Sequence, residues 1–321
     1  MNFQIRLPQE ALSYYGHRAI EKHFRKAIKH EEDVLADRDP EALHQMRVGL
    51  RRLRTAIQVF GFAADLPEAA SEARIRKFAQ VLGAVRDLDV LQLELTSHTS
   101  LPAREQDTLK GSLKKLQQQR SRDFDQLQKT LESKKYEAFK QSMEDWLAWP
   151  QFSAIAQLPI REVLPDILLP LISGILLHPA WLIGVEFESE PDRKVFAPIT
   201  PESIREQLKQ DELLHDLRKQ MKRLRYQTEL FTDFYGKGYE FQVDEFKQIQ
   251  EVLGQIQDSV ILQSFLNKHL NDSIEKLCPT FSGRLDQRMA IAWKEWRSLQ
   301  EKYLDVDFRI QLRQLVLQPK S

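Results

Sequence analysis

A basic sequence signature occurs twice in the chain, with the second copy 171 residues after the first. The first copy, LHQMRVGLRRLR, begins at Leu43, and the second, LHDLRKQMKRLR, begins at Leu214. The tripeptide VLG, followed by an aspartate four residues after its glycine, recurs at the same separation, with the aspartates at Asp87 and Asp258. Self-similarity at a fixed separation indicates a tandem duplication. Each half should therefore fold alike and place its basic helix at an equivalent position.

The composition indicates a globular all-α protein. The 321 residues are enough for one large unit or two of middle size, and 42% of them are hydrophobic, which argues against disorder. Charged residues make up 29% of the chain and glycine is scarce, a combination typical of long amphipathic helices. The 47 basic side chains are balanced by 47 acidic ones, so any anion site must come from local patterning.

Hydrophobic periodicity and helix-start signals predict two sets of helices. Asp39-Pro40 starts a helix in the manner of an N-cap followed by proline in the first turn. The segments predicted for the first half are 10–36, 39–61, 68–96 and 102–147, the last with a break or a frayed end. Those predicted for the second half are 202–235, 240–270, 281–303 and 305–317. Short connections favour antiparallel packing, so we predict one four-helix bundle over residues 1–150 and another over 151–321.

Residues 160–185 form a strongly apolar stretch that raises the question of a membrane span. Asp166, His178 and three prolines interrupt the stretch, so no clean apolar run of the length needed to cross a bilayer survives. We therefore predict a packed or broken helix here and no association with a membrane. Residues 186–201 are polar and contain three prolines, and they are predicted to be a surface loop.

The N-terminal residues and the cysteine content favour a cytoplasmic protein. The start of the chain lacks a basic region followed by an apolar run, so a secretory signal is not expected. The single cysteine, Cys278, cannot form an internal disulfide, which suits a reducing compartment. A zinc site built from several cysteines is excluded for the same reason.

The signature places its cations on one side of a helix. At about 100° per residue, the histidine and three cations of each copy fall within about 80°, beside an apolar face of similar width. These residues are His44, Arg47, Arg51 and Arg54 in the first copy and His215, Arg218, Lys222 and Arg225 in the second. No Asp or Glu lies between His44 and Phe60 to pair with the cations along the helix, as would be usual on a solvated surface. The cations therefore repel each other unless an anion, or acids from another helix, face them.

A third basic stripe lies on the first predicted helix. Arg18, Lys22, Arg25 and Lys29 fall within about 60° of one another around its axis. If this stripe and that of the second helix face one cavity, the row of charges suits an extended repeating anion better than a small metabolite. Arginine and lysine both bind phosphoryl oxygens, and arginine can bind two at once.

The doubled motif, together with Leu-Gly-x-x-Arg-Asp-Leu-Asp at residues 82–89, resembles the CHAD family, the histidine-containing α-helical domain. The resemblance covers nearly the whole chain. It implies two four-helix bundles related by a pseudo-twofold axis, with basic helices of both halves lining a central groove. It also implies binding of inorganic polyphosphate in the cytoplasm, where many members associate with polyphosphate granules. The motif positions, with the first-helix stripe added from geometry alone, give these predicted polyphosphate-binding residues: Arg18, Lys22, Arg25, Lys29, His44, Arg47, Arg51, Arg52, Arg54, His215, Arg218, Lys222, Arg223 and Arg225.

Some family members carry a triphosphate-tunnel (CYTH) domain that hydrolyses phosphate chains. Glu186-Phe187-Glu188 is similar to the start of that domain's Glu-x-Glu-x-Lys strand, but Glu190 stands where the lysine is needed. No strand-rich region follows, so we predict a loop and no such domain. The chain also departs from the more basic members in its zero net charge, and Lys222 and Gln257 stand where the first half has arginines.

His44 and His215 admit three roles. They could contact phosphate, make structural hydrogen bonds between helices, or ligate a metal across the pseudo-twofold axis together with Asp87, Asp89 or Asp258. The flanking arginines oppose a divalent cation, so no metal site is predicted. Beside bound phosphate each imidazole would hold its proton more tightly, and binding should then strengthen below neutral pH.

The remaining motifs favour binding over catalysis. Asp87, Asp89 and Asp258 are predicted to hold arginines of the neighbouring basic helix in extended rotamers. The sequence shows no nucleophile with an ordered base, no phosphate-cradling glycine loop and no metal-ligand spacing, so we predict a non-enzymatic protein without a cofactor. Two alternatives stay open. One is binding of nucleic-acid backbones, for which the motif helices offer only Tyr226 to stack on bases; the other is a metal-dependent phosphohydrolase that uses the paired histidines. The sequence leaves the oligomeric state open.

Overall fold

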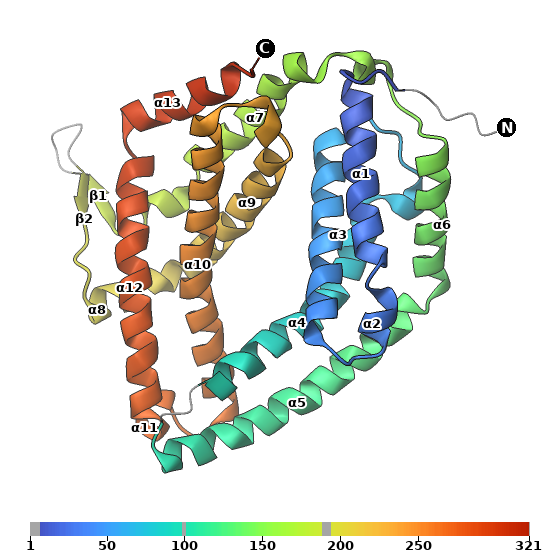
Figure 1. Cartoon of the computed structure of the whole chain (residues 1–321). Coiled ribbons are helices and arrows are strands. Elements are labelled where there is room, and N and C mark those ends of the chain that lie inside the picture. The colour runs from blue at the N-terminus through green and yellow to red at the C-terminus, as the bar shows by residue number, and fades with distance from the viewer. Residues whose placement is uncertain (1–6, 98–100, 188–193, 321) are drawn as a thin grey trace. The chain divides into compact units, whose positions relative to one another are not determined.

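The computed structural model describes residues 7–97, 101–187 and 194–320, which are predominantly helical (Figure 1). The predicted all-α class is confirmed, and within the described residues the strands form a single two-stranded sheet. The chain divides into two compact units. The first comprises Met1–Thr99 and Leu113–Val163, and the second comprises Ser100–Ser112 and Leu164–Ser321. Neither unit is continuous in sequence, unlike the predicted bundles over 1–150 and 151–321.

Local capping signals set the helix ends in the first half of the chain. The elements are α1 (Leu12–Ile28), α2 (Glu31–Leu35), α3 (Pro40–Phe60), η1 (Glu68–Ala70), α4 (Glu72–Ser97), α5 (Ala103–Leu131), α6 (Lys134–Ala148) and η2 (Ala154–Gln157). The carboxylate of Asp39 accepts a hydrogen bond from the Glu41 N–H at 2.8 Å and caps α3 as predicted. The predicted break in the last helix falls between α5 and α6, where the Ser133 hydroxyl accepts a hydrogen bond from the Tyr136 N–H.

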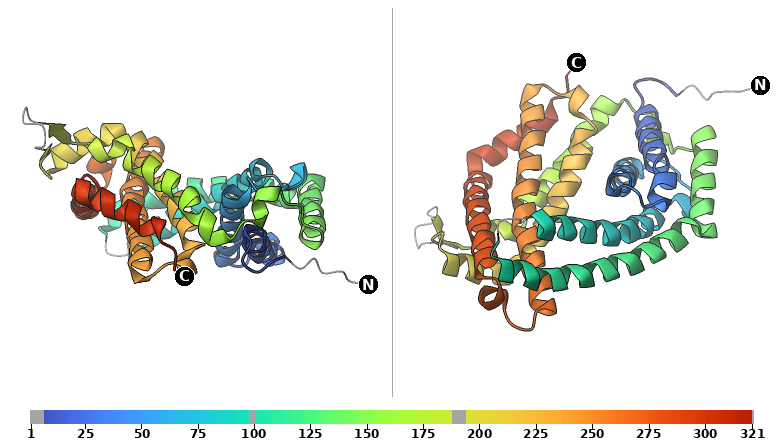
Figure 2. Two further views of the ribbon diagram at one scale, coloured as in Figure 1. Left: turned by 90° about the horizontal axis from the view of Figure 1, so that it is seen from above. Right: turned by 60° about the horizontal axis from the view of Figure 1, so that its bottom comes forward.

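The second half begins with the apolar helix and is otherwise mainly helical. Its elements are α7 (Ile160–Leu176), η3 (Pro179–Leu182), β1 (Val185–Phe187), β2 (Lys194–Phe196), α8 (Pro201–Gln207), η4 (Leu208–Gln210), α9 (Asp211–Glu229), η5 (Thr232–Phe234), α10 (Lys237–His269), α11 (Ile274–Leu277), α12 (Pro279–Tyr303) and α13 (Val306–Leu317). Helix α10 lies between α9 and α12 and packs against both (Figures 1 and 2). The segment predicted as one helix over 202–235 is divided into α8, α9 and short 3-10 turns.

The apolar segment is a packed helix followed by a 3-10 turn. By length and composition alone, Ile160–Leu182 could cross a membrane. In the structure its side chains contribute to a protein core, with Leu164 and Leu168 fully buried. The amide of Gln300 donates a hydrogen bond of 2.8 Å to the carbonyl oxygen of Trp181 and so ties the end of the segment to α12. The segment is therefore partly buried, with 44% of its apolar window inside the protein.

The prediction of a loop over 186–201 is wrong in part. β1 pairs with β2 in antiparallel register, with Glu186 opposite Val195. Each strand contains one valine and one phenylalanine, residue types that favour strands. Three residues are too few for a periodic pattern to predict a strand. Glu188 and Glu190, on which the comparison with the CYTH strand depends, lie outside the described residues.

Helices α1 and α3 approach closely because each presents a glycine to the other. A Cβ atom at Gly16 would lie 3.1 Å from Cγ of Phe60, and one at Gly49 would lie 2.6 Å from the backbone Cα of Ala27. The pairing of the start of α1 with the end of α3 makes the two helices antiparallel (Figure 1). Gly49 lies inside the first signature, so this contact fixes the signature helix in the first unit.

A buried carboxylate from α5 caps the N-terminus of α12. Glu105, in the first turn of α5, accepts hydrogen bonds from the N–H groups of Thr280 at 3.1 Å and Phe281 at 3.0 Å. Burial by itself would raise the pKa of Glu105, but these hydrogen bonds outweigh it and the pKa is lowered. The charged carboxylate therefore satisfies the free N–H groups of the α12 N-terminus.

Candidate anion-binding faces on α3 and α9

The two signatures form equivalent amphipathic helices. Their leucines and methionines are buried: Leu43, Met46, Leu50 and Leu53 in α3, and Leu214, Leu217, Met221 and Leu224 in α9. The histidine and the cations beside this face are partly exposed in both helices. The predicted packing face and the adjacent cationic face are therefore present in each unit.

Each signature has one arginine that rests on a glycine of the next long helix. The Arg47 guanidinium packs on Gly83 of α4, where a Cβ atom would come within 3.4 Å of its Nε. Its Nη2 lies 3.2 Å from a carboxylate oxygen of Asp87, one turn further along α4. The predicted support of this arginine by Asp87 is present.

The same arrangement recurs in the second unit. The Arg218 guanidinium packs on Gly254 of α10, where a Cβ atom would lie 3.2 Å from Nη2. Asp258, one turn further along, lies 3.5 Å from the same nitrogen. The glycine of the repeated VLG tripeptide and the following aspartate thus do the same in both units. They hold the guanidinium in place and set the register between the basic helix and the long helix next to it.

Asp89 does not support the basic helix as predicted. Its carboxylate accepts a hydrogen bond of 2.6 Å from Nε of Arg120 in α5. The other nitrogens of Arg120 donate to both oxygens of Asp37, in the connection between α2 and α3. The hydrogen bonds that Arg120 donates to Asp37 are the largest influence on the pKa of Arg120, which is raised. Helix α5 supplies the cation, and no motif in the sequence indicates this pairing.

Arg54 and Arg225, at the ends of the two cationic faces, are engaged by acids within the protein. Arg54 Nε donates to Glu72 of α4 at 2.9 Å, and Arg225 Nε donates to Glu229 of its own helix at 2.8 Å. Arg54 and Arg225 are equivalent in the duplication, whereas Glu72 and Glu229 are not. Each half therefore neutralises this arginine with an acid at a different position. The structure therefore gives these two arginines a bracing role, unlike Arg47 and Arg218, whose acidic partners are mostly exposed.

The basic stripe of α1 does not share a face with that of α3, contrary to the expectation of one cavity. Arg18, Lys22, Arg25 and Lys29 are all exposed. The α1 residues that contact α3, Gly16 and Ala27, lie on the opposite side of the helix. Arg25 also donates a hydrogen bond to Glu144 of α6. The helical wheel shows that four charges line up, but only the packing shows which way they point.

Two further arginines of the site prediction, Arg52 and Arg223, lie outside the row of matched cations. Arg52 of α3 lies on the side that faces α1, near the buried His23. Burial, with the charge of Arg52 next in importance, lowers the pKa of His23 to about 4. Arg223 of α9 is exposed.

Each signature histidine lies among cations, but the two surroundings differ. Burial, followed by the charge of Arg86 on α4, lowers the pKa of His44 below its ordinary value of 6.5. Burial, followed by the charge of Lys219 one turn along α9, lowers the pKa of His215 in the same way. The His215 side chain also makes a hydrogen bond with Gln257. Both imidazoles are therefore neutral at pH 7, and Arg86 and Lys219 are residues that the sequence prediction omitted.

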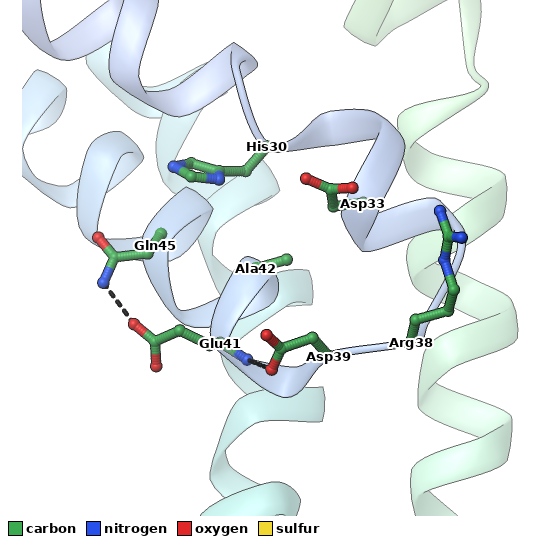
Figure 3. A pocket seen from close by; sticks show the side chains of 7 residues that line it. All are labelled: His30, Asp33, Arg38, Asp39, Glu41, Ala42 and Gln45. Carbon is green, nitrogen blue, oxygen red and sulfur yellow. Dashed lines mark hydrogen bonds between the residues drawn. The ribbon is translucent and has the colours of Figure 1, made fainter.

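One pocket of the first unit lies at the start of α3 (Figure 3). It has a volume of about 310 Å³, and its charged lining consists of Asp33, Asp39 and Glu41 with Arg38, beside His30. Its carboxylates make it unsuitable for an anion. Among the described residues, no group of three or more His, Cys, Asp or Glu side chains could hold a metal ion.

Comparison with known proteins finds one matching family and similar solved structures. The family model of the CHAD domain matches residues 18–267. The crystal structure of the CHAD domain from the plant Ricinus communis is similar, with a TM-score of 0.60 and 20% sequence identity over 100% of this chain and 98% of that chain. PptA from Streptomyces chartreusis is similar with a TM-score of 0.56 and 12% identity over 95% and 99% of the two chains. At these identities the likeness shows a shared fold alone, and no curated protein matches the sequence. Because the family model spans well over half of its length, the chain belongs to the CHAD family.

Proposed function

We propose that the protein binds inorganic polyphosphate, without catalysing a reaction, on the cationic faces of α3 and α9. The observation that carries the proposal is the doubled arrangement of a seated arginine and a neutral histidine among cations. Arg47 and Arg218 are held in place by Gly83 and Gly254, and their guanidinium side chains remain 30% and 21% exposed. A fixed, partly exposed guanidinium is suited to charge-assisted hydrogen bonds with phosphoryl oxygens.

Membership of the CHAD family supports this ligand, because members of the family bind inorganic polyphosphate. The side chains on the two faces are cations, imidazoles and aspartates already held to arginine. This set can stabilise negative charge on phosphoryl oxygens but supplies no activated nucleophile. A location in the cytoplasm at polyphosphate granules is part of the same proposal.

Binding of nucleic acid is disfavoured by the position of the aromatic side chain. Tyr226 is 6% exposed, and the guanidinium carbon of Arg225 lies 5.1 Å from the centre of its ring. It therefore cannot stack on bases, which supplies much of the affinity for single strands.

Competition binding tests the proposal. A fluorescently labelled long-chain polyphosphate is bound to the protein and displaced by unlabelled polyphosphate, single-stranded DNA or single-stranded RNA, each at equal phosphate concentration. We expect polyphosphate to displace the probe at the lowest concentration and the protein to release no orthophosphate, with or without Mg²⁺. Equal displacement by all three polymers would make the protein a general polyanion binder, and release of orthophosphate would make it an enzyme.

The lowered pKa values of His44 and His215 predict a pH dependence of binding. Phosphate beside an imidazole stabilises the protonated form, so the pKa in the complex exceeds that in the free protein. Affinity should then be constant at high pH, rise as the pH falls through the pKa of the complex, and level off below the pKa of the free protein. Because burial and cations place the free value below 6.5, the rise should extend further into the acid range than for ordinary histidines. We expect a gain of about tenfold between about pH 8 and pH 5.

The control for this effect is the double variant His44→Gln/His215→Gln, measured with the same polyphosphate. It retains every cation and every acid of the two faces, so any remaining pH dependence belongs to other groups. A wild-type profile that matches the profile of the variant would give the histidines a structural role.

A further inference from the structure

We propose that Arg86 and Lys219 are equivalent anion-binding residues. Each adds a third cation to a pair from the basic helix, Arg47 and Arg51 in the first unit and Arg218 and Lys222 in the second. Neither residue belongs to the signature positions that match between the halves. The inference rests on the proposed function and extends it, because it names cations that do not match between the two copies of the motif. In the first unit the third cation comes from the facing helix, and in the second it comes from the basic helix itself.

The common register of the helices makes positions 86 and 257 equivalent. Gly83 and Gly254 each support the signature arginine, and Asp87 and Asp258 each reach it one turn later. The residue before each aspartate therefore faces the same part of the basic helix in both units. In the second unit that residue is Gln257, and its hydrogen bond with His215 shows that this position reaches the imidazole.

The loss of charge at one position coincides with a gain at another. Position 257 holds a neutral glutamine where the first unit has Arg86, and Lys219 stands where the first unit has Val48. Lys219 is exposed and follows His215 by four residues, so the two side chains are neighbours on one side of α9. Apart from the braced Arg54 and Arg225, each face thus keeps three cations.

Retention of three cations is what binding of a polyanion requires, since affinity depends on the number of phosphate contacts more than on the helix that provides them. Packing gives no comparable reason for the exchange. Lys219 is exposed, and the hydrogen bond between His215 and Gln257, which raises the pKa of the imidazole, does not depend on a lysine nearby. The acids near the two histidines, Glu41 and Asp211, lie on the basic helices themselves and do not alter this count.

A charge-exchange experiment tests the proposal. In the second unit the variants are Lys219→Val, Gln257→Arg and the two together, which recreates the arrangement of the first unit. The dissociation constant for long-chain polyphosphate is measured over a series of salt concentrations. We expect Lys219→Val to weaken binding about fivefold and to lower the salt slope by roughly one contact. The double variant should return to within about twofold of wild type.

The reverse exchange in the first unit covers the case in which an arginine at the buried position 257 prevents folding. Arg86→Gln should weaken binding as Lys219→Val does, and Arg86→Gln/Val48→Lys should restore it. The matched control is Lys276→Val. Lys276 is an exposed lysine of α11 that is paired with Asp272, and its loss should leave binding unchanged. Loss of affinity in the control equal to that of Lys219→Val would assign the effect to net charge and overturn the proposal.

A second readout does not involve the ligand. The pKa of the His215 imidazole, followed by NMR, should rise in Lys219→Val and fall again in Lys219→Val/Gln257→Arg, because each cation disfavours the protonated ring. If the wild type binds no polyphosphate, the proposed function fails. If the wild type binds, but neither double variant recovers affinity while both remain folded, the equivalence of Arg86 and Lys219 fails on its own.

Discussion

Replacement of Arg47 and Arg218 together with alanine is expected to weaken polyphosphate binding about 100-fold, with about tenfold from each residue. Both guanidinium groups are fixed on a glycine and partly shielded from water, so their hydrogen bonds to phosphate should be stronger than those of freely moving surface side chains. The two residues belong to different units, and their effects should therefore add. In a salt titration the slope of log Kd against log salt should fall by roughly 0.7–0.9 for each lost contact, as for phosphates of nucleic acids.

The matched control is Arg54→Ala/Arg225→Ala. It removes the same charge from the same two helices, but at positions that are already paired with Glu72 and Glu229. We expect the affinity to change about twofold at most, while the free energy of unfolding decreases as the bracing contacts are lost. A control as defective in binding as Arg47→Ala/Arg218→Ala would mean that total charge, and not the seated arginines, determines affinity.

Substitution of Gly49 by alanine is expected to lower the free energy of unfolding by about 2–3 kcal/mol. The new Cβ atom would lie 2.6 Å from Cα and 2.7 Å from N of Ala27. Both are backbone atoms and cannot rotate away, so α1 and α3 would have to separate and open their shared core. The intrinsic preference of a helix for alanine over glycine returns about 1 kcal/mol, which is too little to compensate fully.

Gly111 on α5 provides the control for this prediction. An added Cβ atom there meets nothing within 4 Å, so Gly111→Ala should raise the free energy of unfolding by up to about 1 kcal/mol. Urea denaturation of the three proteins measures both effects. Equal stability of Gly49→Ala and the wild type would show that α1 and α3 are not held at this distance.

The sequence predicts those features of the fold that depend on neighbouring residues. The Asp39 cap and the apolar and cationic faces of the signatures follow from spacing along one helix. For the segment 102–147 the sequence predicts a break or a frayed end, but not the position of the break at Ser133. The repeat separation adds one long-range inference, because it makes Gly83 and Gly254 equivalent positions of the two halves before any contact is known.

What could not be predicted depends on which helices face each other. The α1 stripe has the same periodicity as that of α3, but its direction is set by the contact of Gly49 with Ala27. The second half has Gln220 at the position of Gly49, so the duplication itself gives no indication of this close approach. Pairing of Asp89 with Arg120 likewise needs the position of α5. Lys219 could have been found from the sequence, since alignment of the halves at their fixed offset shows the exchange of charge with Arg86.

The helix that supplies Glu105 also limits how the protein can be dissected. Ser100–Ser112 belongs to the second unit, although the chain then returns to the first unit for Leu113–Val163. A fragment that starts at residue 151 would lack the carboxylate that caps α12, and a fragment that ends at residue 150 would carry the capping segment without the helix that it caps. The two halves repeat in sequence, but cutting one peptide bond cannot separate the two structural units, because each unit consists of two chain segments. Any attempt to produce one half as an autonomous domain must therefore move the first turns of α5 with the second half, for instance by circular permutation.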